Sequence, residues 1–485
     1  MKVIFLALNS SYVHTLLAPR YLVANCSYPV EIVETNVNAS LKEVADTVSE
    51  KRPDVLAISC YIFNIKFVKE ILVIIKRKLP SVKIILGGYE VSYNPEDYLA
   101  LADYIIQGEG DFEFGKLILD IEKGTERERI INGNVIETLD SIKSPYSEEY
   151  CSQGDKKIIY YESSRGCPFN CSYCMSSNTK VRAFSLERVY SDLDNIMNYN
   201  PKLVKFVDRT FNYNLARAKD IIKQIIEKYS DRNTKFHFEV SPELFDEELL
   251  ALFSNVRENL MQLEIGIQSF NQETLAAVNR KANLEILERN ISFLSKTKVP
   301  IHTDLIAGLP HEGYQSFVDG FNKLYSLNPG QLQLGFLKIL KGAPIENNIV
   351  NYRISPDPPY EILSTPWLTE KELANLKIAE DMLDLYHNSG RFKRALSFII
   401  PMFYPISPFY FFYELGNYFV STGLKRKGST APMQSQAIYD FVKQKCIEFN
   451  LPQSELNDAL YQLAKHLNAD YKSSGNNRKW KRNIK

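Results

Sequence analysis

"SSRGCPFNCSYCMSS", residues 163–177, places Cys167, Cys171 and Cys174 within eight residues, whereas the other four cysteines of the chain are scattered singly. The spacing CxxxCxxC lets one loop supply three thiolates to one centre. An iron–sulfur cube is normally held by four thiolates, one on each iron, so a set of three leaves one iron open. The stretch therefore predicts a [4Fe–4S] cluster whose open iron can bind a further ligand.

A zinc site and fortuitous clustering of the cysteines are the alternatives to an iron–sulfur cluster. A zinc site would need a fourth ligand, and His237 or His302 could supply it only if the fold brought one of them close to the loop. Disulfides are not expected, because the apolar run in "MKVIFLALNSSYVH" is too short for a signal peptide, and the protein should stay in the reducing cytoplasm.

Length and charge limit the number of domains and the class of partner. A chain of 485 residues predicts two or three domains. Lys plus Arg equals Asp plus Glu at 58 each, so no charge excess favours a nucleic acid as partner. We expect a small-molecule or peptide substrate instead.

The first part of the chain alternates short apolar runs with stretches of helical spacing. The apolar runs are residues 2–8, 31–35, 54–60, 82–86 and 103–107. This alternation predicts an α/β fold, with a doubly wound, Rossmann-like parallel sheet over residues 1–135 and ligands at the carboxyl ends of its strands. The candidate binding residues at those ends are His14, Ser59, Gly87, Gly88, Gly108, Glu109 and Gly110. Their glycines would let the backbone approach a bulky ligand, although tight turns would also account for them.

A second series of strands follows a charged, turn-rich stretch at residues 123–157. Its apolar runs are residues 158–162, 203–208, 235–240, 262–267, 300–306 and 331–339. Six βα units predict a partial (β/α)6 barrel of TIM type over residues 150–350. The cysteine loop follows the first of these strands, so it should lie at the functional mouth of the barrel.

The cysteine loop resembles that of the radical S-adenosylmethionine (radical SAM) enzymes, in which CxxxCxΦC holds a [4Fe–4S] cluster. Tyr173 occupies the aromatic position Φ. Further matches are "VKFVDRTFN" (204–212), "FHFEVSPE" (236–243), "LEIGIQSF" (263–270), "DLIAGLP" (304–310) and "FLKILKGAP" (336–344). The resemblance implies that the open iron binds the amino and carboxylate groups of S-adenosylmethionine, which is cleaved to a 5′-deoxyadenosyl radical.

Residues at the matching strand ends are candidates for binding S-adenosylmethionine. Asp208 and Glu239 suit its ammonium or ribose, and Arg209 suits its carboxylate. Gln268 and Ser269 offer neutral hydrogen bonds. The apolar turn that contains Ile306 and Gly308 offers a flat surface for adenine. For each of these residues a structural role, in a cap or an ion pair, is the alternative, and Asp208 and Arg209 could pair with one another.

The first domain is similar to the cobalamin-binding domain fused to many radical SAM enzymes, with the ending "LGGYEVSYNPEDYL…ADYIIQGEGD". This resemblance implies a corrin over the strand ends. In the pattern DxHxxG that supplies a histidine to cobalt, His14 is present, but Tyr12 and Leu17 stand in place of Asp and Gly. A metal-bound histidine is usually oriented by a carboxylate, so we expect His14 to be a loop or substrate-side residue. Base-off binding without a protein ligand stays open.

Residues 351–485 begin as a proline-rich linker and are expected to continue as helices. They resemble the carboxyl-terminal extension of an uncharacterised subgroup of cobalamin-domain radical enzymes, which shares "NSSYVHTLLAPRYL" (9–22). The most apolar stretch, residues 395–419, contains Pro401, Pro405 and Pro408, which would break a spanning helix. We therefore expect no membrane span, but a buried aromatic helix pair or the wall of a substrate channel.

These resemblances imply a cytoplasmic enzyme that uses a [4Fe–4S] cluster, S-adenosylmethionine and cobalamin to transfer a methyl group to an unactivated carbon. A reductase such as flavodoxin or ferredoxin would supply electrons. A radical enzyme that lacks a corrin or does not methylate, and that catalyses cyclisation, thiolation or oxidative rearrangement, is the alternative. An iron–sulfur redox protein is disfavoured, because it needs no open iron.

Overall fold

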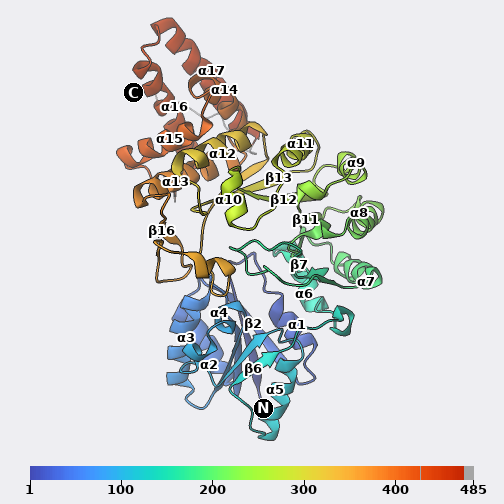
Figure 1. The fold of residues 1–485 in the computed structure, drawn as a ribbon. Helices are drawn as coiled ribbons and strands as arrows, with labels where there is room; N and C mark the ends of the chain where they lie inside the picture. Colours follow the sequence, from blue (N-terminus) through green and yellow to red (C-terminus); the bar gives the residue numbers. More distant parts are fainter. Residues whose placement is uncertain (427, 474–485) are drawn as a thin grey trace. The chain divides into compact units, whose positions relative to one another are not determined.

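Strand β1 (Val3–Asn9) is buried along its whole length in the computed structural model, which describes residues 1–426 and 428–473. Helices cover both faces of its sheet, which explains the continuous apolar run (Figure 1). Alternate β1 side chains pack against α2 (Leu41–Lys51) and α3 (Ile65–Lys78) on one face. On the other face Phe5 packs against Phe114 of α5 (Glu113–Lys123).

The first sheet has six parallel strands in the order β2-β1-β3-β4-β5-β6. Besides β1 they are β2 (Val30–Asn36), β3 (Val55–Ser59), β4 (Lys83–Gly87), β5 (Tyr104–Gly108) and β6 (Ile130–Gly133). The strand order reverses between β1 and β3, and ligands bind outside the carboxyl ends of strands at such a switch point. Strand β6 lies within the stretch that we expected to be turn-rich. It is a short edge strand in which only Ile131 is buried, so its apolar signal is weak.

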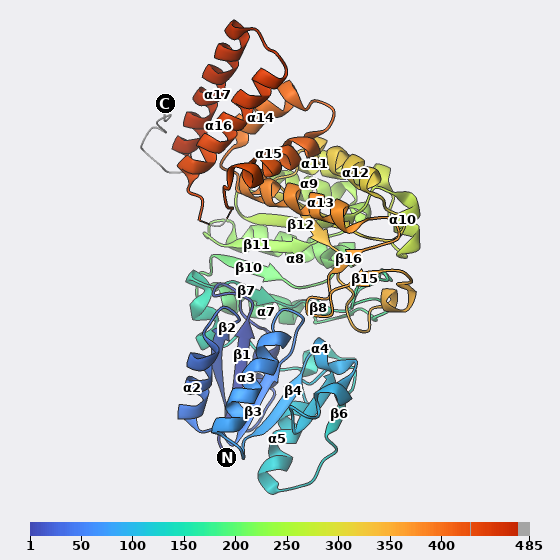
Figure 2. The same ribbon diagram turned by 90° about the vertical axis from the view of Figure 1, so that its left-hand side faces the viewer.

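The second sheet also has six parallel strands, which follow one another in chain order (Figure 2). They are β7 (Ile159–Tyr161), β10 (Leu203–Phe206), β11 (Lys235–Glu239), β12 (Met261–Gln268), β13 (Ile301–Ala307) and β14 (Gln331–Phe336). The helices between them are α7 (Leu186–Met197), α8 (Leu215–Tyr229), α9 (Glu247–Asn255), α10 (Gln272–Ala277), α11 (Leu284–Leu294) and α12 (Tyr314–Ser326). Two antiparallel strands of two residues each, β8 (Ser164–Arg165) and β9 (Arg182–Ala183), flank the cysteine loop. The sequence did not predict this hairpin.

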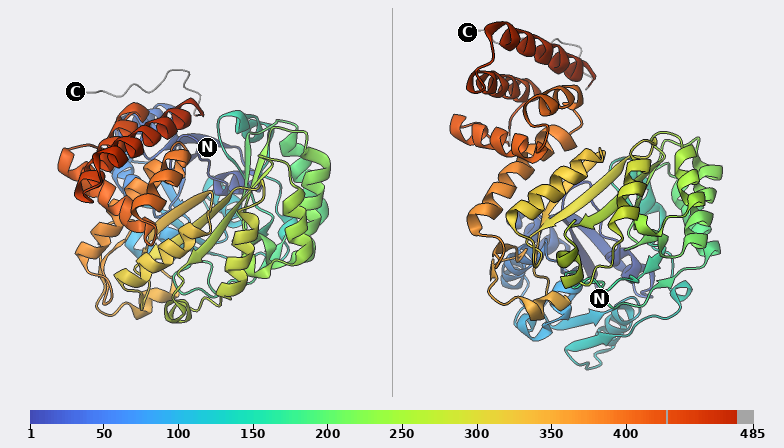
Figure 3. Two further views of the ribbon diagram at one scale, coloured as in Figure 1. Left: turned by 90° about the horizontal axis from the view of Figure 1, so that it is seen from above. Right: turned by 45° about the horizontal axis from the view of Figure 1, so that its top comes forward.

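The carboxyl-terminal region is mainly helical, as predicted. A small hairpin, β15 (Arg353–Ile354) with β16 (Ile362–Ser364), precedes α13 (Glu370–Met382) and a π-helical turn (Leu383–Asn388). The helices α14 (Lys393–Phe403), α15 (Pro408–Thr422), α16 (Ala431–Glu448) and α17 (Gln453–Ser473) follow, with α16 and α17 side by side (Figure 3). Within the described residues no single helix is long and apolar enough to cross a membrane. The helices α14 and α15 reach that length and apolar character only when they are taken together, and the chain bends by 106° between them.

The chain divides into two compact units. Unit 1 comprises Met1–Leu263, Lys338–Ile349 and Ser355–Glu361, and unit 2 comprises Glu264–Leu337, Val350–Ile354 and Ile362–Lys485. The fold class is the predicted one: a Rossmann-like sheet, a partial barrel and a helical carboxyl-terminal region. The domain boundaries 1–135, 150–350 and 351–485 stay predictions.

Candidate active site

The β8–β9 hairpin forms the neck of the cysteine loop in unit 1. Its strands pair Ser164 with Ala183 and Arg165 with Arg182, so the two ends of the loop are held side by side. Cys171 is buried, and Cys167 and Cys174 are half-buried. Among the described residues no three Cys, His, Asp or Glu side chains converge on one point as the ligands of a single metal ion do. The thiolates of an iron–sulfur cube need not converge in this way, because each binds a different iron.

Asp208, at the end of β10, anchors the segment that leads into the cysteine loop. One carboxylate oxygen accepts hydrogen bonds from the hydroxyls of Ser163 (2.6 Å) and Ser164 (2.5 Å), and the other accepts from the Ser163 backbone N–H (3.1 Å). The side chain is 1% exposed, and burial raises the pKa of its carboxyl more than these bonds lower it. These contacts favour the positioning role of Asp208 over direct ligand binding.

Arg209 borders a cavity, and its charge lies close to those of Glu239 and of the loop cysteines. Arg209 is exposed as a residue, although protein atoms surround its guanidinium on most sides. Burial alone would lower the pKa of Arg209, but the nearby acidic groups, Glu239 first among them, outweigh it and raise the pKa. Asp208 is bonded to the two serines instead, so the described contacts do not pair it with Arg209.

A cavity of about 910 Å³ lies in unit 1 beyond the carboxyl ends of the first sheet. Six of the seven residues that we predicted at these strand ends line it: Ser59, Gly87, Gly88, Gly108, Glu109 and Gly110. Gly88 has φ +97°, and a Cβ there would lie 2.6 Å from the carbonyl oxygen of Cys60, so the turn after β4 requires glycine. The cavity also borders the cysteine loop at Gly166, Ser176 and Lys180.

His14, the seventh predicted residue, is not among the residues that line the cavity. Its Nδ1 lies 2.6 Å from the hydroxyl of Tyr160 on β7, and burial and the charge of Lys205 lower its pKa. Among the described residues the lining of the cavity contains no His, Cys or Met side chain. None of the described side chains that line this cavity is therefore of the nitrogen or sulfur types that ligate cobalt.

Several lining residues were not predicted from the sequence. Tyr21 and Leu22 come from α1 (Ala18–Ala24), and Tyr89 and Ser92 from α4 (Tyr89–Ser92). Short helices of this kind carry a weak periodic signal, so nothing in the sequence marked these side chains as site residues. "QGEGD" offered a signal for Asp111, the fifth residue of that stretch, but Arg165 and Arg182 had none.

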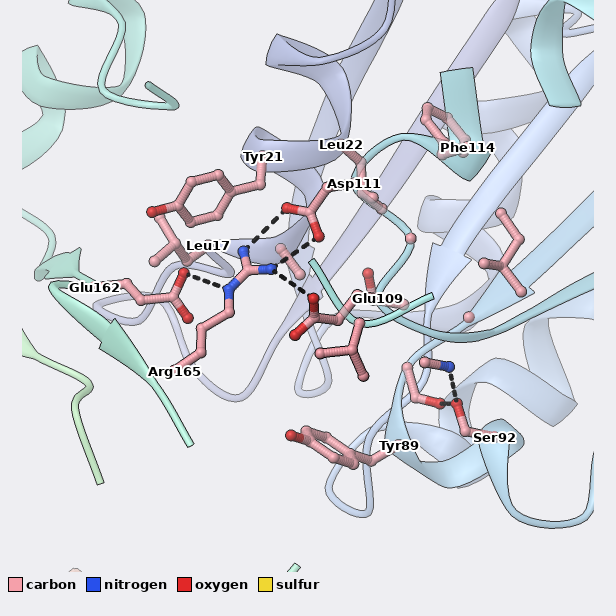
Figure 4. A pocket seen from close by; sticks show the side chains of 18 of the residues that line it. Leu17, Tyr21, Leu22, Tyr89, Ser92, Glu109, Asp111, Phe114, Glu162 and Arg165 are labelled. Atoms are coloured by element: carbon pink, nitrogen blue, oxygen red, sulfur yellow. Dashed lines mark hydrogen bonds and ion pairs between the residues drawn. The ribbon is translucent and has the colours of Figure 1, made fainter. Parts of the chain in front are cut away.

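The side chains that line one part of the cavity form a network of ion pairs (Figure 4). The Arg165 guanidinium donates two bonds of 3.0 Å to the two carboxylate oxygens of Asp111, and its Nε donates to Glu162 at 3.0 Å. Arg182 binds both carboxylate oxygens of Glu109. Burial raises the pKa of Glu162, whereas the pKa of Glu109 is lowered, because Arg182, the Ile136 backbone and Arg165 outweigh its burial.

In unit 2, Gln268 at the end of β12 adopts φ +73°, a left-handed conformation that is uncommon for residues other than glycine. Its side chain folds back over Gly266, where a Cβ would lie 2.1 Å from the amide nitrogen. Ser269 donates a hydrogen bond of 2.6 Å to Oε1 of Glu312, which is 1% exposed. Burial raises the pKa of Glu312 to about 7. We did not predict Glu312, although it closely follows the "DLIAGLP" match.

The turn after β13 contains Ile306 and Gly308. Gly308 has φ +92°, and a Cβ there would lie 1.8 Å from Cδ1 of Ile362, so this glycine admits the Ile362 side chain from the carboxyl-terminal region. Ile306 is half-buried on β13. An adenine-binding role for these two residues stays a prediction, as do the roles of Tyr173, Glu239 and Gln268.

The residues present fit the implied cofactors. Three thiols on one loop match a cluster with an open iron. The cavity combines apolar side chains such as Phe5, Ile85 and Phe114 with charged and hydroxyl groups from the loops. This lining suits a large ligand with both apolar and amide surfaces, as a corrin nucleotide has.

Comparisons with known proteins divide the chain into three matched regions. Residues 12–118 match the B12 binding domain, residues 161–324 match the Radical SAM superfamily, and residues 350–485 match a protein family of unknown function, DUF4080. The first two matches imply cobalamin, a [4Fe–4S] cluster and S-adenosylmethionine as cofactors.

Two curated relatives are methyltransferases. The cobalamin-dependent radical SAM methyltransferase TokK of Streptomyces tokunonensis is 23% identical over 74% of this chain and 58% of its own length. The 2-(S-pantetheinyl)-carbapenam-3-carboxylate methyltransferase of Streptantibioticus cattleyicolor is 25% identical over 60% of this chain and 48% of its own length. The chain thus spans about half the length of these relatives.

Two solved structures share the fold. The cobalamin-dependent S-adenosylmethionine radical enzyme OxsB, with aqua-cobalamin bound, superposes with a TM-score of 0.64 over 98% of this chain and 81% of its own, at 15% identity. The radical S-adenosylmethionine methyltransferase TsrM of Kitasatospora setae, with cobalamin and a [4Fe–4S] cluster bound, gives 0.60 over 74% and 79%, at 16% identity. With its B12-binding domain, radical SAM domain and DUF4080 region, the chain belongs to the cobalamin-dependent radical SAM enzymes.

Proposed function

We propose that the chain is a cobalamin-dependent radical methylase that acts on an unactivated carbon of a small-molecule or peptide substrate. The cavity supports this proposal most directly, because the strand ends of the first sheet and the cysteine loop border the same 910 Å³ space. A corrin in this space would face the cluster loop without an intervening protein layer. Direct transfer of a group from cobalt to a nearby radical requires this proximity.

The cofactors would carry out the reaction, and the side chains would bind and position them. When bound, the cluster supplies an electron that cleaves S-adenosylmethionine to a 5′-deoxyadenosyl radical, and the corrin supplies the methyl group. Cys167, Cys171 and Cys174 would hold the cluster, and Asp208 would fix the strand that leads to it. Arg209, exposed in the cavity, would pair with the carboxylate of S-adenosylmethionine.

The lining of the cavity also supports a particular mode of corrin binding. Because no described His, Cys or Met side chain lines it, we infer that cobalt receives no ligand from the protein. His14 bonds to Tyr160 instead. The names of both curated relatives support methylation over the other radical reactions.

Anaerobic reconstitution with iron, sulfide and hydroxocobalamin tests the proposal. With S-adenosylmethionine that carries a deuterated methyl group and reduced flavodoxin or ferredoxin, we expect 5′-deoxyadenosine, S-adenosylhomocysteine and trideuteromethyl-cobalamin. The Cys171→Ala variant should no longer form 5′-deoxyadenosine. The Cys446→Ala variant, which changes a buried cysteine distant in sequence from the cysteine loop, should still form it.

Two results would contradict the proposal. Stoichiometric corrin with 5′-deoxyadenosine but no label on cobalt would point to cyclisation, thiolation or an oxidative rearrangement. Failure of the wild-type protein to bind any corrin would leave a corrin-free radical enzyme.

A further inference from the structure

We propose that two arginine–carboxylate clamps, Arg165 with Asp111 and Arg182 with Glu109, are positioning residues that hold the cluster loop at a fixed distance from the corrin. The proposal rests on the proposed occupancy of the cavity by a corrin. All four residues line that cavity, and all four belong to unit 1.

The two arginines occupy the neck of the cysteine loop. Arg165 and Arg182 are directly paired in the β8–β9 hairpin, one just before the loop and the other just after it. Arg165 is two residues from Cys167. A shift of either arginine therefore moves the backbone that carries the cluster ligands, and holding both fixes the loop at its two ends.

The two carboxylates belong to one short turn of the neighbouring domain. Glu109 and Asp111 follow β5, at the edge where a corrin would lie. Arg165 meets Asp111 through two bonds of 3.0 Å, and Arg182 meets Glu109 through both of its terminal nitrogens. Bidentate contacts of this kind fix orientation as well as distance.

Burial of these pairs favours a positioning role over a stabilising one. The side chains of Arg165 and Asp111 are 14% and 7% exposed, and those of Arg182 and Glu109 are 10% and 20% exposed. The desolvation cost of buried ion pairs can match or exceed their attraction, so well-packed apolar side chains would stabilise the fold as well. Apolar side chains would not, however, define the relative position of the two loops.

The surrounding charges strengthen this inference. Glu162 accepts from Nε of Arg165, and Glu109 lies 3.8 Å from the same guanidinium, so the two clamps share a carboxylate. The Ile136 backbone donates to Glu109 and accepts from Arg182. The clamps therefore form one network, and release of one should loosen the other.

The position of the loop matters because group transfer depends steeply on geometry. A misplacement of about 1 Å can lower a rate by about 100-fold. Loosened clamps should affect cleavage of S-adenosylmethionine less than methyl transfer, since cleavage needs only the cluster loop. Steps that need the corrin and the cluster together should slow.

The test uses the full chain loaded with cluster and cob(II)alamin. Pulsed electron paramagnetic resonance measures the dipolar coupling between the reduced cluster and cob(II)alamin, which varies with the inverse cube of their distance. Arg165→Lys and Arg182→Lys keep the positive charge but lose the planar guanidinium that binds both oxygens of a carboxylate. We expect a single narrow coupling in the wild type and a broadened or shifted coupling in both variants, with unchanged iron and cobalt contents. Arg127→Lys, which alters an Arg–carboxylate pair with Asp120 outside the cavity, should match the wild type.

An unchanged coupling in both clamp variants would overturn the proposal, and so would loss of corrin from both, which would assign the pairs to corrin binding. Hydrogen exchange of the protein without corrin provides a second measurement. Either variant should raise exchange in residues 108–111 and 166–181 together, and a rise confined to the substituted side would contradict a shared clamp. The proposed function fails if the wild type binds no corrin or does not methylate the corrin that it binds. Neither of these results depends on the clamp variants, so the two failures are distinguishable.

Discussion

Glu312 should make the stability of unit 2 depend on pH between pH 4.5 and about 7. Its carboxyl accepts from the hydroxyls of Ser269 (2.6 Å) and Ser316 (3.5 Å) through one oxygen. The other oxygen is buried, with no hydrogen-bond partner in the described part of the chain. A buried oxygen without a donor disfavours the carboxylate, and burial raises the pKa of Glu312 from 4.5 to about 7.

The sign and size of the effect follow from linkage. Because the folded pKa is higher than the unfolded one, the folded state binds more protons between pH 4.5 and about 7. The contribution of Glu312 to the free energy of unfolding is therefore fully present below pH 4.5. It falls by about 1.4 kcal/mol per pH unit in this window and levels off above it. The total loss is about 3 kcal/mol, of which about 2 kcal/mol falls between pH 5.5 and 7.5.

Hydrogen exchange of peptides from β12 and β13, corrected for intrinsic rates, measures this loss at pH 5.5 and 7.5. Glu312→Gln keeps an acceptor for Ser269 and cannot ionise, so its local stability should not fall over this range on account of residue 312. The exposed Glu285→Gln serves as the control and should behave like the wild type. If the wild type and Glu312→Gln lose protection equally as the pH rises, the raised pKa is refuted.

Further predictions concern the cofactors and the carboxyl-terminal region. Replacing any of the three loop cysteines by Ala should abolish cluster assembly by iron analysis, and Cys446→Ala should retain it. The electron paramagnetic resonance spectrum of bound cob(II)alamin should show no nitrogen splitting, in the wild type as in His14→Ala; splitting that vanishes in the variant would make His14 a cobalt ligand. Asn388→Ala should lower the unfolding free energy by about 1–3 kcal/mol, because the N–H and C=O of Leu332 lose their partner; an unchanged urea transition would contradict this.

The sequence predicted the strands of both sheets well because their apolar residues form either continuous runs or an alternating pattern. Buried β1 and alternating β12 gave clear signals, whereas the short edge strand β6 was hidden in a charged stretch. The strand-end residues that line the cavity could be named, since each lies next to a recognisable strand. The cysteine loop could be singled out by its spacing, and the role of its thiols as cluster ligands stays a prediction. Contacts between distant segments could not be predicted in this way. Arg165 and Asp111 are 54 residues apart, and no local pattern indicates that they form a pair.

Asp208 shows why a motif alone does not assign a role. Its place at the end of β10 is compatible with ligand binding and with structural support, and only the three bonds to Ser163 and Ser164 favour the second. Those bonds depend on the path of the chain between β7 and the cysteine loop. A local pattern contains no information on that path.

The carboxyl-terminal region contributes to the barrel at two points within unit 2. The side-chain amide of Asn388 donates to the Leu332 carbonyl (2.8 Å) and accepts from its N–H (2.9 Å), so it pairs with edge strand β14 as a further strand would. Ile362 fills the space that the missing side chain of Gly308 leaves. An open sheet edge must be covered or blunted to avoid pairing with other chains. The DUF4080 region therefore completes the radical SAM fold, and the glycine of "DLIAGLP" is required for that packing whether or not the same turn also contacts adenine.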